Sequence, residues 1–124
     1  MVTPLYLHFT LDGDPIPKGR PRHGNGRSFT PQRTRDAEQS IRDRVSLLDL
    51  TPYDGPVAVS LTFWCATRRR TDLDNMVKLV TDALNGLAYT DDHLIHRISA
   101  RLHRRAIGEV PRTEVRIESL GSAA

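Results

Sequence analysis

Apolar and polar residues alternate along four segments of the chain, which is the pattern of half-buried β-strands. These strands are predicted at residues 5–11, 57–65, 98–102 and 115–117. Two other segments, 34–48 and 74–85, carry apolar residues three and four positions apart, and this spacing predicts amphipathic helices. The second helix should end at Gly86, because glycine readily adopts the left-handed conformation that terminates helices.

The predicted elements follow one another in the order β-α-β-α-β-β, which indicates an α+β fold with two helices against a small mixed sheet. We expect a single domain over residues 1–120 and a flexible tail at 121–124. Residues 12–33 are rich in Gly, Pro and Arg and predict a long loop. Loops of this length are usually functional or disordered, and the basic residues here favour a function.

The composition is that of an ordinary globular protein, with 38% hydrophobic and 27% charged residues. One cysteine cannot form an internal disulfide, and no segment approaches the roughly 18 apolar residues of a membrane span. The opening Met-Val-Thr-Pro-Leu-Tyr has neither the basic stretch nor the apolar run of a signal peptide. We therefore expect a cytoplasmic protein that has no membrane partner.

The net charge of +3 is small, but the basic residues gather in a few short segments. Clusters of this kind suit a phosphate-rich partner such as DNA, although solvated loops and strand ends are an equally ordinary explanation. The candidates for contacts with the DNA backbone are Lys18, Arg20, Arg22, Arg69 and Arg70.

A group of acidic residues surrounds the second predicted helix. Asp72 and Asp74 would project to the same side of an extended segment, and Lys78 lies four residues further on. Asp91 and Asp92 follow the helix, and they approach the first pair only if the turn packs against the end of the preceding strand. Clustered carboxylates repel one another unless a divalent cation such as Mg²⁺ or Mn²⁺ joins them. Such a site suits phosphodiester hydrolysis, with a lysine stabilising the extra negative charge of the transition state.

Each of these residues also has a simpler interpretation. Asp72 or Asp74 could cap the helix N-terminus, and Asp74 could form an exposed ion pair with Lys78. Asp91 and Asp92 could be turn residues, and Asp82 is expected to be solvated on the helix surface. The combination of residues, more than any one of them, favours a metal site.

Two motifs carry a family resemblance. One is Arg69-Arg70-Thr71-Asp72-Leu73-Asp74-Asn75, followed by Lys78, Asp82-Ala83-Leu84-Asn85-Gly86, Tyr89 and Asp91-Asp92; the other is Pro15-Ile16-Pro17-Lys18-Gly19-Arg20-Pro21-Arg22. Together they resemble the RusA-type Holliday-junction resolvases, or crossover junction endodeoxyribonucleases, which are often phage- or prophage-encoded. The resemblance covers nearly the whole chain.

The resemblance implies a homodimeric, Mg²⁺-dependent endonuclease that acts on four-way DNA junctions. It makes Asp72, Asp74 and Asp92 the catalytic aspartates and metal ligands, and Lys78 the catalytic lysine. The role of Asp91 is less defined. His93-Leu94 departs from the Gln or Ser-Gln of other members, which affects contacts near the site but removes no ligand.

The resulting hypothesis is structure-selective DNA hydrolysis, in which a two-fold dimer makes paired cuts at a junction. The main alternative is a branched-DNA binding module without catalysis, but no carboxylate of the motif is missing. A phosphoryl-transfer enzyme acting on nucleotides would need a phosphate-cradling glycine loop, and Gly24–Gly26 has no such spacing. A purely structural domain would leave the arginine clusters unexplained.

Overall fold

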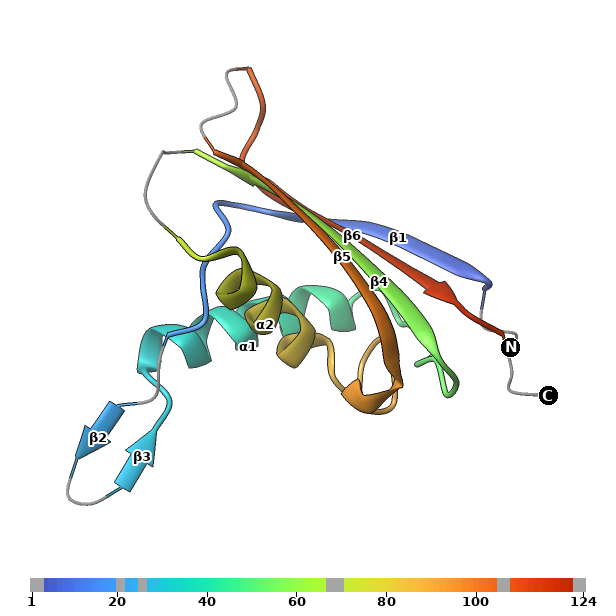
Figure 1. Cartoon of the computed structure of the whole chain (residues 1–124), viewed down its shortest axis with the longest axis horizontal. Coiled ribbons are helices and arrows are strands. Elements are labelled where there is room, and N and C mark those ends of the chain that lie inside the picture. Colours follow the sequence, from blue (N-terminus) through green and yellow to red (C-terminus); the bar gives the residue numbers. More distant parts are fainter. Residues whose placement is uncertain (1–3, 20–21, 25–26, 67–70, 105–107, 122–124) are drawn as a thin grey trace.

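Figure 1 shows the computed structural model, in which two helices cover one face of a four-stranded mixed sheet. It describes residues 4–19, 22–24, 27–66, 71–104 and 108–121, with only the backbone for 22–24 and 27–29. The elements are β1 (Tyr6–Asp12), β2 (Arg22–Gly24), β3 (Arg27–Phe29), α1 (Gln32–Ser46), β4 (Val57–Cys65), α2 (Leu73–Leu84), the 3₁₀ turn η1 (Asp92–Leu94), β5 (Ile95–Arg104) and β6 (Arg112–Ser119). The α+β class and the predicted order of the main sheet and helices are confirmed.

The sheet has the strand order β1-β6-β4-β5. β6 pairs antiparallel with both β1 and β4, whereas β4 and β5 pair in parallel, with Leu61 opposite Ala100. Parallel neighbours need a long crossover connection, and α2 provides it. The helix therefore runs back along the sheet between the end of β4 and the start of β5.

The core lies between the sheet and the two helices. The central strand β4 is buried along most of its length, and Val57, Val59 and Leu61 are at most 1% exposed. From α2 the core receives Met76, Leu79, Val80, Ala83 and Leu84, and from α1 it receives Ala37, Ile41 and Val45. Arg42 of α1 donates to the carbonyls of Ala83 and Asn85 at 2.9 and 2.8 Å, which places a positive charge at the C-terminus of α2.

Several boundaries differ from the sequence prediction, and three of the differences affect apolar residues. α1 ends at Ser46, so Leu48 lies beyond it and is 48% exposed. Leu5 precedes β1 and is 80% exposed. β5 begins at Ile95, earlier than predicted, and its Ile98 is 48% exposed because β5 is an edge strand that the helices cover only in part.

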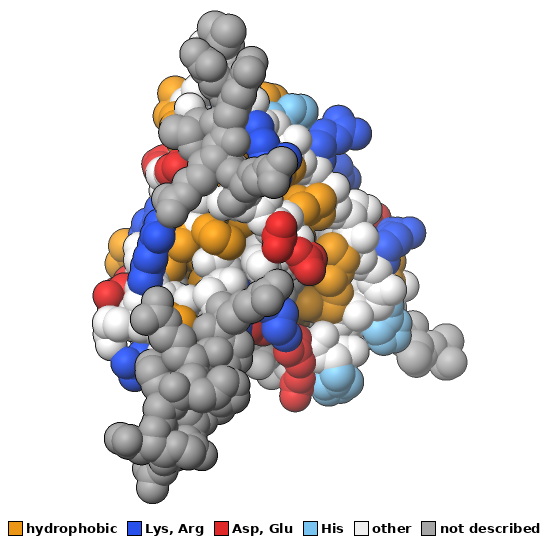
Figure 2. Space-filling view, turned by 60° about the vertical axis from the view of Figure 1, so that its left-hand side comes forward, with side chains coloured by type: hydrophobic (Ala, Val, Ile, Leu, Met, Phe, Trp, Pro, Cys, Tyr) orange, Lys and Arg blue, Asp and Glu red, His pale blue; other side chains and the backbone are white. Residues whose placement is uncertain are grey.

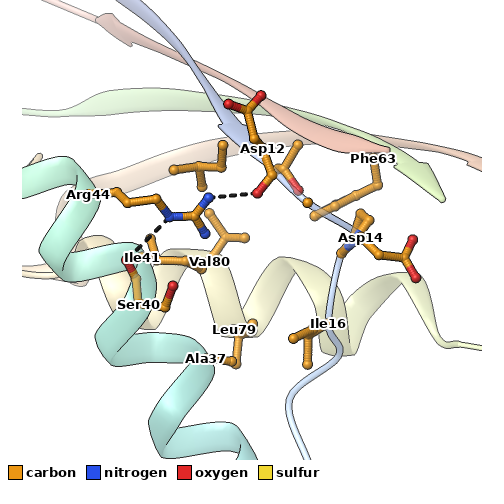
Figure 3. Close-up of a pocket in the computed structure, with 14 residues that line it drawn as sticks. Asp12, Asp14, Ile16, Ala37, Ser40, Ile41, Arg44, Phe63, Leu79 and Val80 are labelled. Atoms are coloured by element: carbon orange, nitrogen blue, oxygen red, sulfur yellow. Dashed lines mark hydrogen bonds between the residues drawn. The ribbon is translucent and has the colours of Figure 1, made fainter. Parts of the chain in front are cut away.

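The predicted long loop of residues 12–33 is only partly a loop. It contains the antiparallel hairpin of β2 and β3, which projects from the helical side of the molecule (Figure 1). Residues 13–16 close a small pocket of about 80 Å³ against α1 and α2 (Figure 3). Arg44 donates to the carbonyl of Asp12 at 2.6 Å, and the carboxylate of Asp14 accepts from the backbone N–H of Ala66 at 2.9 Å. The basic segment is therefore anchored before the hairpin begins.

Shortening the central strand's side chains should destabilise the protein strongly. Leu61→Ala should lower the free energy of unfolding by about 2–5 kcal/mol, because it leaves a cavity in a fully buried position. Urea denaturation followed by circular dichroism measures this. The matched control is Leu47→Ala at a position that is 86% exposed, which should change stability by less than about 0.5 kcal/mol. Equal effects of the two changes would contradict the core described above.

Candidate active site

An open groove of about 490 Å³ runs between α2 and the edge strand β5. The apolar part of its lining comes from both sides and consists of Leu73 and Val77 of α2 and Ile95, Ile98 and Ala100 of β5. The charged residues of the groove are Asp74, Lys78, Asp82 and Asp92, and Thr81 completes the lining. Figure 2 shows a face of the molecule on which acidic and apolar side chains lie next to one another with basic side chains around them. Three of the four catalytic residues implied by the sequence resemblance thus line one groove.

Asp72 and Asp74 lie at the N-terminus of α2. Asp72 is the extended residue before the helix, and its carboxylate lies 3.4 Å from the side-chain amide of Asn75 without capping a backbone N–H. Asp74 is already in the first helical turn and accepts from the backbone N–H of Asn75 at 3.0 Å. The prediction that both aspartates belong to one extended segment is therefore wrong, because the helix begins at Leu73. Both side chains are exposed and accessible to a ligand.

Asp91 and Asp92 lie at the start of the 3₁₀ turn that precedes β5. The Asp91 carboxylate accepts from the backbone N–H of His93 at 3.2 Å and lies 3.2 Å from the Nδ1 atom of the same residue. The backbone hydrogen bond is the main cause that lowers the pKa of Asp91, followed by the side chains of His93 and Asp92. Asp91 thus serves the local turn, whereas the neighbouring Asp92 lines the groove.

The chain does not bring the three predicted metal ligands together. Asp72 precedes α2, whereas Asp92 follows the turn after its other end, and a helix of 12 residues is about 18 Å long. That turn packs on the segment before β4: the carbonyl of Ala88 accepts from Tyr53 N–H at 2.9 Å, and the carbonyl of Tyr53 accepts from Thr90 N–H at 2.9 Å. Among the residues that the structure describes, no three acidic, histidine or cysteine side chains form a metal site.

The donor chemistry of the groove nevertheless suits Mg²⁺. Asp74 and Asp92 supply hard carboxylate oxygens along one groove. Proteins commonly hold this ion with one or two carboxylates, waters and substrate phosphate oxygens, without a closed protein cage. The residues present therefore fit an ion that substrate, or a second copy of the chain, helps to bind.

Lys78 forms an ion pair with Asp82, whereas the sequence analysis considered a pair with Asp74. Its Nζ lies 3.6 Å from Oδ1 of Asp82, four residues further along α2, and no ion pair with Asp74 is present within the described part of the chain. The side chain of Asp82 is only 21% exposed, and its Oδ2 atom accepts a hydrogen bond from the Nζ of Lys18 at 2.5 Å. That hydrogen bond is the largest cause that raises the pKa of Lys18. The expectation that Asp82 is merely solvated is wrong, and its place one helical turn after Lys78 was the signal for it in the sequence.

Tyr89 lies in the core behind the acidic residues. Its side chain is fully buried, and its hydroxyl donates to the backbone carbonyl of Thr81. Burial raises the pKa of Tyr89 far above its ordinary value, and the negative charges of Asp92 and Asp82 add to this effect. Tyr89 thus supports the groove from behind and remains a neutral hydrogen-bond donor.

The predicted DNA contacts are described only in part. Lys18 is 26% exposed and engaged with Asp82 and Glu38. Arg22 belongs to β2, where the backbone alone is described, and Arg20, Arg69 and Arg70 lie outside the described residues. Their contacts with DNA remain predictions.

Carboxylates and a lysine along an open groove of a small α+β fold suit the chemistry of nucleases, the enzymes that cut phosphodiester bonds. The model of the family described as endodeoxyribonuclease RusA matches residues 12–118 of the 124-residue chain, and the protein belongs to this family. The matched range includes every residue of the groove, and the family implies Holliday-junction resolvase activity. A search of curated proteins gave no match. No helix in the described ranges is long and apolar enough to cross a membrane.

The local role of Asp91 can be tested by titration. In metal-free protein, carboxyl ¹³C NMR should give a pKa for Asp91 below the ordinary value of 3.8. The reason is that the hydrogen bond from the backbone N–H of His93 favours the charged carboxylate. The stabilisation that Asp91 contributes to the folded state is therefore present above pH 3.8, and it is lost as the pH falls through the lower pKa of Asp91 in the folded protein. His93→Ala keeps the backbone N–H and should restore only part of the shift. Complete restoration would show that the imidazole, and not the turn, controls Asp91.

Proposed function

We propose that this protein is a Mg²⁺-dependent, structure-selective endodeoxyribonuclease that resolves four-way DNA junctions by paired hydrolysis of phosphodiester bonds. The observation that carries the proposal is the single open groove that Asp74, Lys78 and Asp92 all line, in a chain of the RusA endodeoxyribonuclease family. Water is the nucleophile and the products carry 5′-phosphates. Mn²⁺ is expected to substitute for Mg²⁺, since both prefer oxygen ligands.

The chain's own residues have distinct tasks in this proposal. Asp72, Asp74 and Asp92 hold the ion through carboxylate oxygens, and all three are exposed on the surface that DNA must approach. When bound, the ion lowers the pKa of a coordinated water and offsets charge on the phosphate. Lys78, whose side chain is 61% exposed, can reach a phosphate lying in the groove and stabilise the negative charge that develops there.

The position of Asp92 explains why we propose a homodimer. Asp72 and Asp92 lie at opposite ends of α2 in one chain, and a two-fold axis perpendicular to α2 would place opposite ends of the two copies of this helix side by side. Pairing along the groove would bring the Asp92 end of one copy to the Asp72 end of the other. It would also cover part of the apolar lining on β5, where Ile98 is 48% exposed, and leave the charged part of the groove open to DNA. The two resulting sites account for paired cuts.

Binding of the DNA backbone is assigned to the arginines of two short basic segments, namely Arg20 and Arg22 in the N-terminal segment and Arg69 and Arg70 just before α2. Affinity falls as the salt concentration rises, and each contact of this kind should make the plot of log affinity against log salt concentration steeper by about 0.9. The cytoplasmic location expected from the sequence remains a prediction.

Replacing one groove carboxylate should separate binding from cleavage. Asp74→Asn should lower the rate of four-way junction cleavage in Mg²⁺ at least roughly 100-fold and leave junction affinity within a few-fold. Gel assays with a synthetic junction, a linear duplex and a flap, each with and without Mg²⁺, provide the measurement. The matched control is Asp43→Asn, an exposed carboxylate on α1 that accepts from the side chain of Gln39.

Several outcomes would contradict the proposal. Full cleavage by the Asp74→Asn variant would remove this residue from the catalytic set. Equal digestion of all three substrates would indicate a general nuclease. Junction binding without cleavage by the unaltered protein would favour the alternative of a branched-DNA binding module.

Mixing two inactive variants tests the shared site. Asp72→Asn and Asp92→Asn should each abolish cleavage alone. In a mixed dimer, one site would recover an intact Asp72 from one copy and an intact Asp92 from the other. Each mixed dimer should therefore have one active site out of two. It should nick one strand of a junction without making the paired cut. Mixed dimers that form, as shown by native mass spectrometry, but stay inactive would show that the two aspartates act within one chain.

A further inference from the structure

The carboxylate of Asp82 holds two lysines that are far apart in sequence. Its Oδ1 atom lies 3.6 Å from the Nζ of Lys78, and its Oδ2 atom accepts from the Nζ of Lys18 at 2.5 Å. Lys78 is largely exposed, whereas Asp82 and Lys18 are 21% and 26% exposed. The better-buried contact with Lys18 therefore fixes the carboxylate of Asp82, and this carboxylate in turn restrains the exposed side chain of Lys78.

Lys18 also binds α2 through its backbone. Its N–H donates to the carbonyl of Asn75 at 2.9 Å, in the first turn of the helix, while its side chain reaches Asp82. These two acceptors are seven residues apart, which is about 10 Å along a helix. The ammonium group lies 3.5 Å from Glu38 as well, so Lys18 connects α2 with α1.

Gly19, the residue after Lys18, packs closely against the start of α1. Gly19 donates from its backbone N–H to Oγ1 of Thr34 at 2.9 Å, and Thr34 is only 2% exposed. A Cβ atom at Gly19 would lie 2.9 Å from that oxygen and 3.2 Å from Cγ of Pro31. The segment before the β2–β3 hairpin therefore sits on both helices with no space for a larger residue.

We propose that Asp82 is a positioning residue that directs Lys78 into the groove, and that Lys18 fixes Asp82 instead of binding DNA phosphate. This inference rests on the proposed catalytic role of Lys78. A lysine followed four residues later by an aspartate is the less favourable order on a helix, so this pair adds little stability. Its effect is to select among the side-chain conformations of Lys78. Displacement of a reacting group by about 1 Å can lower a rate roughly 100-fold.

The salt dependence of binding distinguishes the two roles of Lys18. If Lys18 neutralised a phosphate, Lys18→Met would make the fall of log affinity with log salt concentration shallower by about one unit of slope. We expect an unchanged slope and a junction affinity within about threefold, together with a slower single-turnover cleavage rate. A slope reduced by one unit, with an unchanged single-turnover rate, would overturn the assignment.

A double-mutant cycle tests whether Asp82 acts through Lys78. Asp82→Asn should lower the single-turnover rate roughly 10- to 100-fold with little change in junction affinity, and Asp82→Glu should recover part of the rate. In a Lys78→Met background, Asp82→Asn should cause no further loss. Asp43→Asn again serves as the carboxylate control and should leave the rate unchanged. An equal loss in both backgrounds would overturn the proposal.

A second cycle does not depend on cleavage. Urea midpoints of Lys18→Met, Asp82→Asn and the double variant should show that the effect of Asp82→Asn falls by at least half when Lys18 is absent. Additive midpoint shifts would refute the Lys18–Asp82 contact. Absence of cleavage by the unaltered protein would disprove the proposed function and the role of Asp82 with it, whereas normal cleavage by Asp82→Asn would disprove only the role of Asp82.

Discussion

The parallel pairing of β4 with β5 is the constraint on which the rest of this structure depends. Two adjacent parallel strands cannot be joined by a tight turn, so the chain must return along the sheet, and α2 makes that return. Its apolar residues cover β4 and leave part of β5 open. The groove between helix and edge strand is therefore a direct consequence of the topology, and it carries the charged residues that α2 and the following turn present.

The same crossover separates the acidic residues. The first pair lies where α2 begins and Asp92 lies beyond its end, so the carboxylates are distributed along the groove. This arrangement avoids strong repulsion between carboxylates in the absence of a cation. Under the proposed function, a complete metal site would depend on substrate or on a second copy of the chain. In a junction-cutting enzyme, such dependence would couple hydrolysis to assembly on the DNA.

The basic N-terminal segment is connected to this site through polar contacts, of which those of Lys18 are partly buried. Lys18 contacts both helices, and Arg44 and Ala66 bind the residues just before it, Asp12 and Asp14. The hairpin of β2 and β3 thus starts from a fixed point beside the helices. The segment around Lys18, which the sequence predicts as a loop, therefore lies near Lys78, because both lysines contact Asp82. The two lysines are 60 positions apart in the sequence.

The sequence alone determined the secondary structure of the sheet and helices, because each element has one buried face whose period is visible in residues such as Val57, Val59 and Leu61. It also determined the family and the residue types of the site, since these are carried by local motifs such as Asp72-Leu73-Asp74. Only the tertiary structure decided that Asp92 lies at the other end of α2, that Lys78 faces Asp82, and that Lys18 reaches the same carboxylate. The physical reason is that strand order and the direction of a crossover arise from long-range packing, which no spacing within a single segment records.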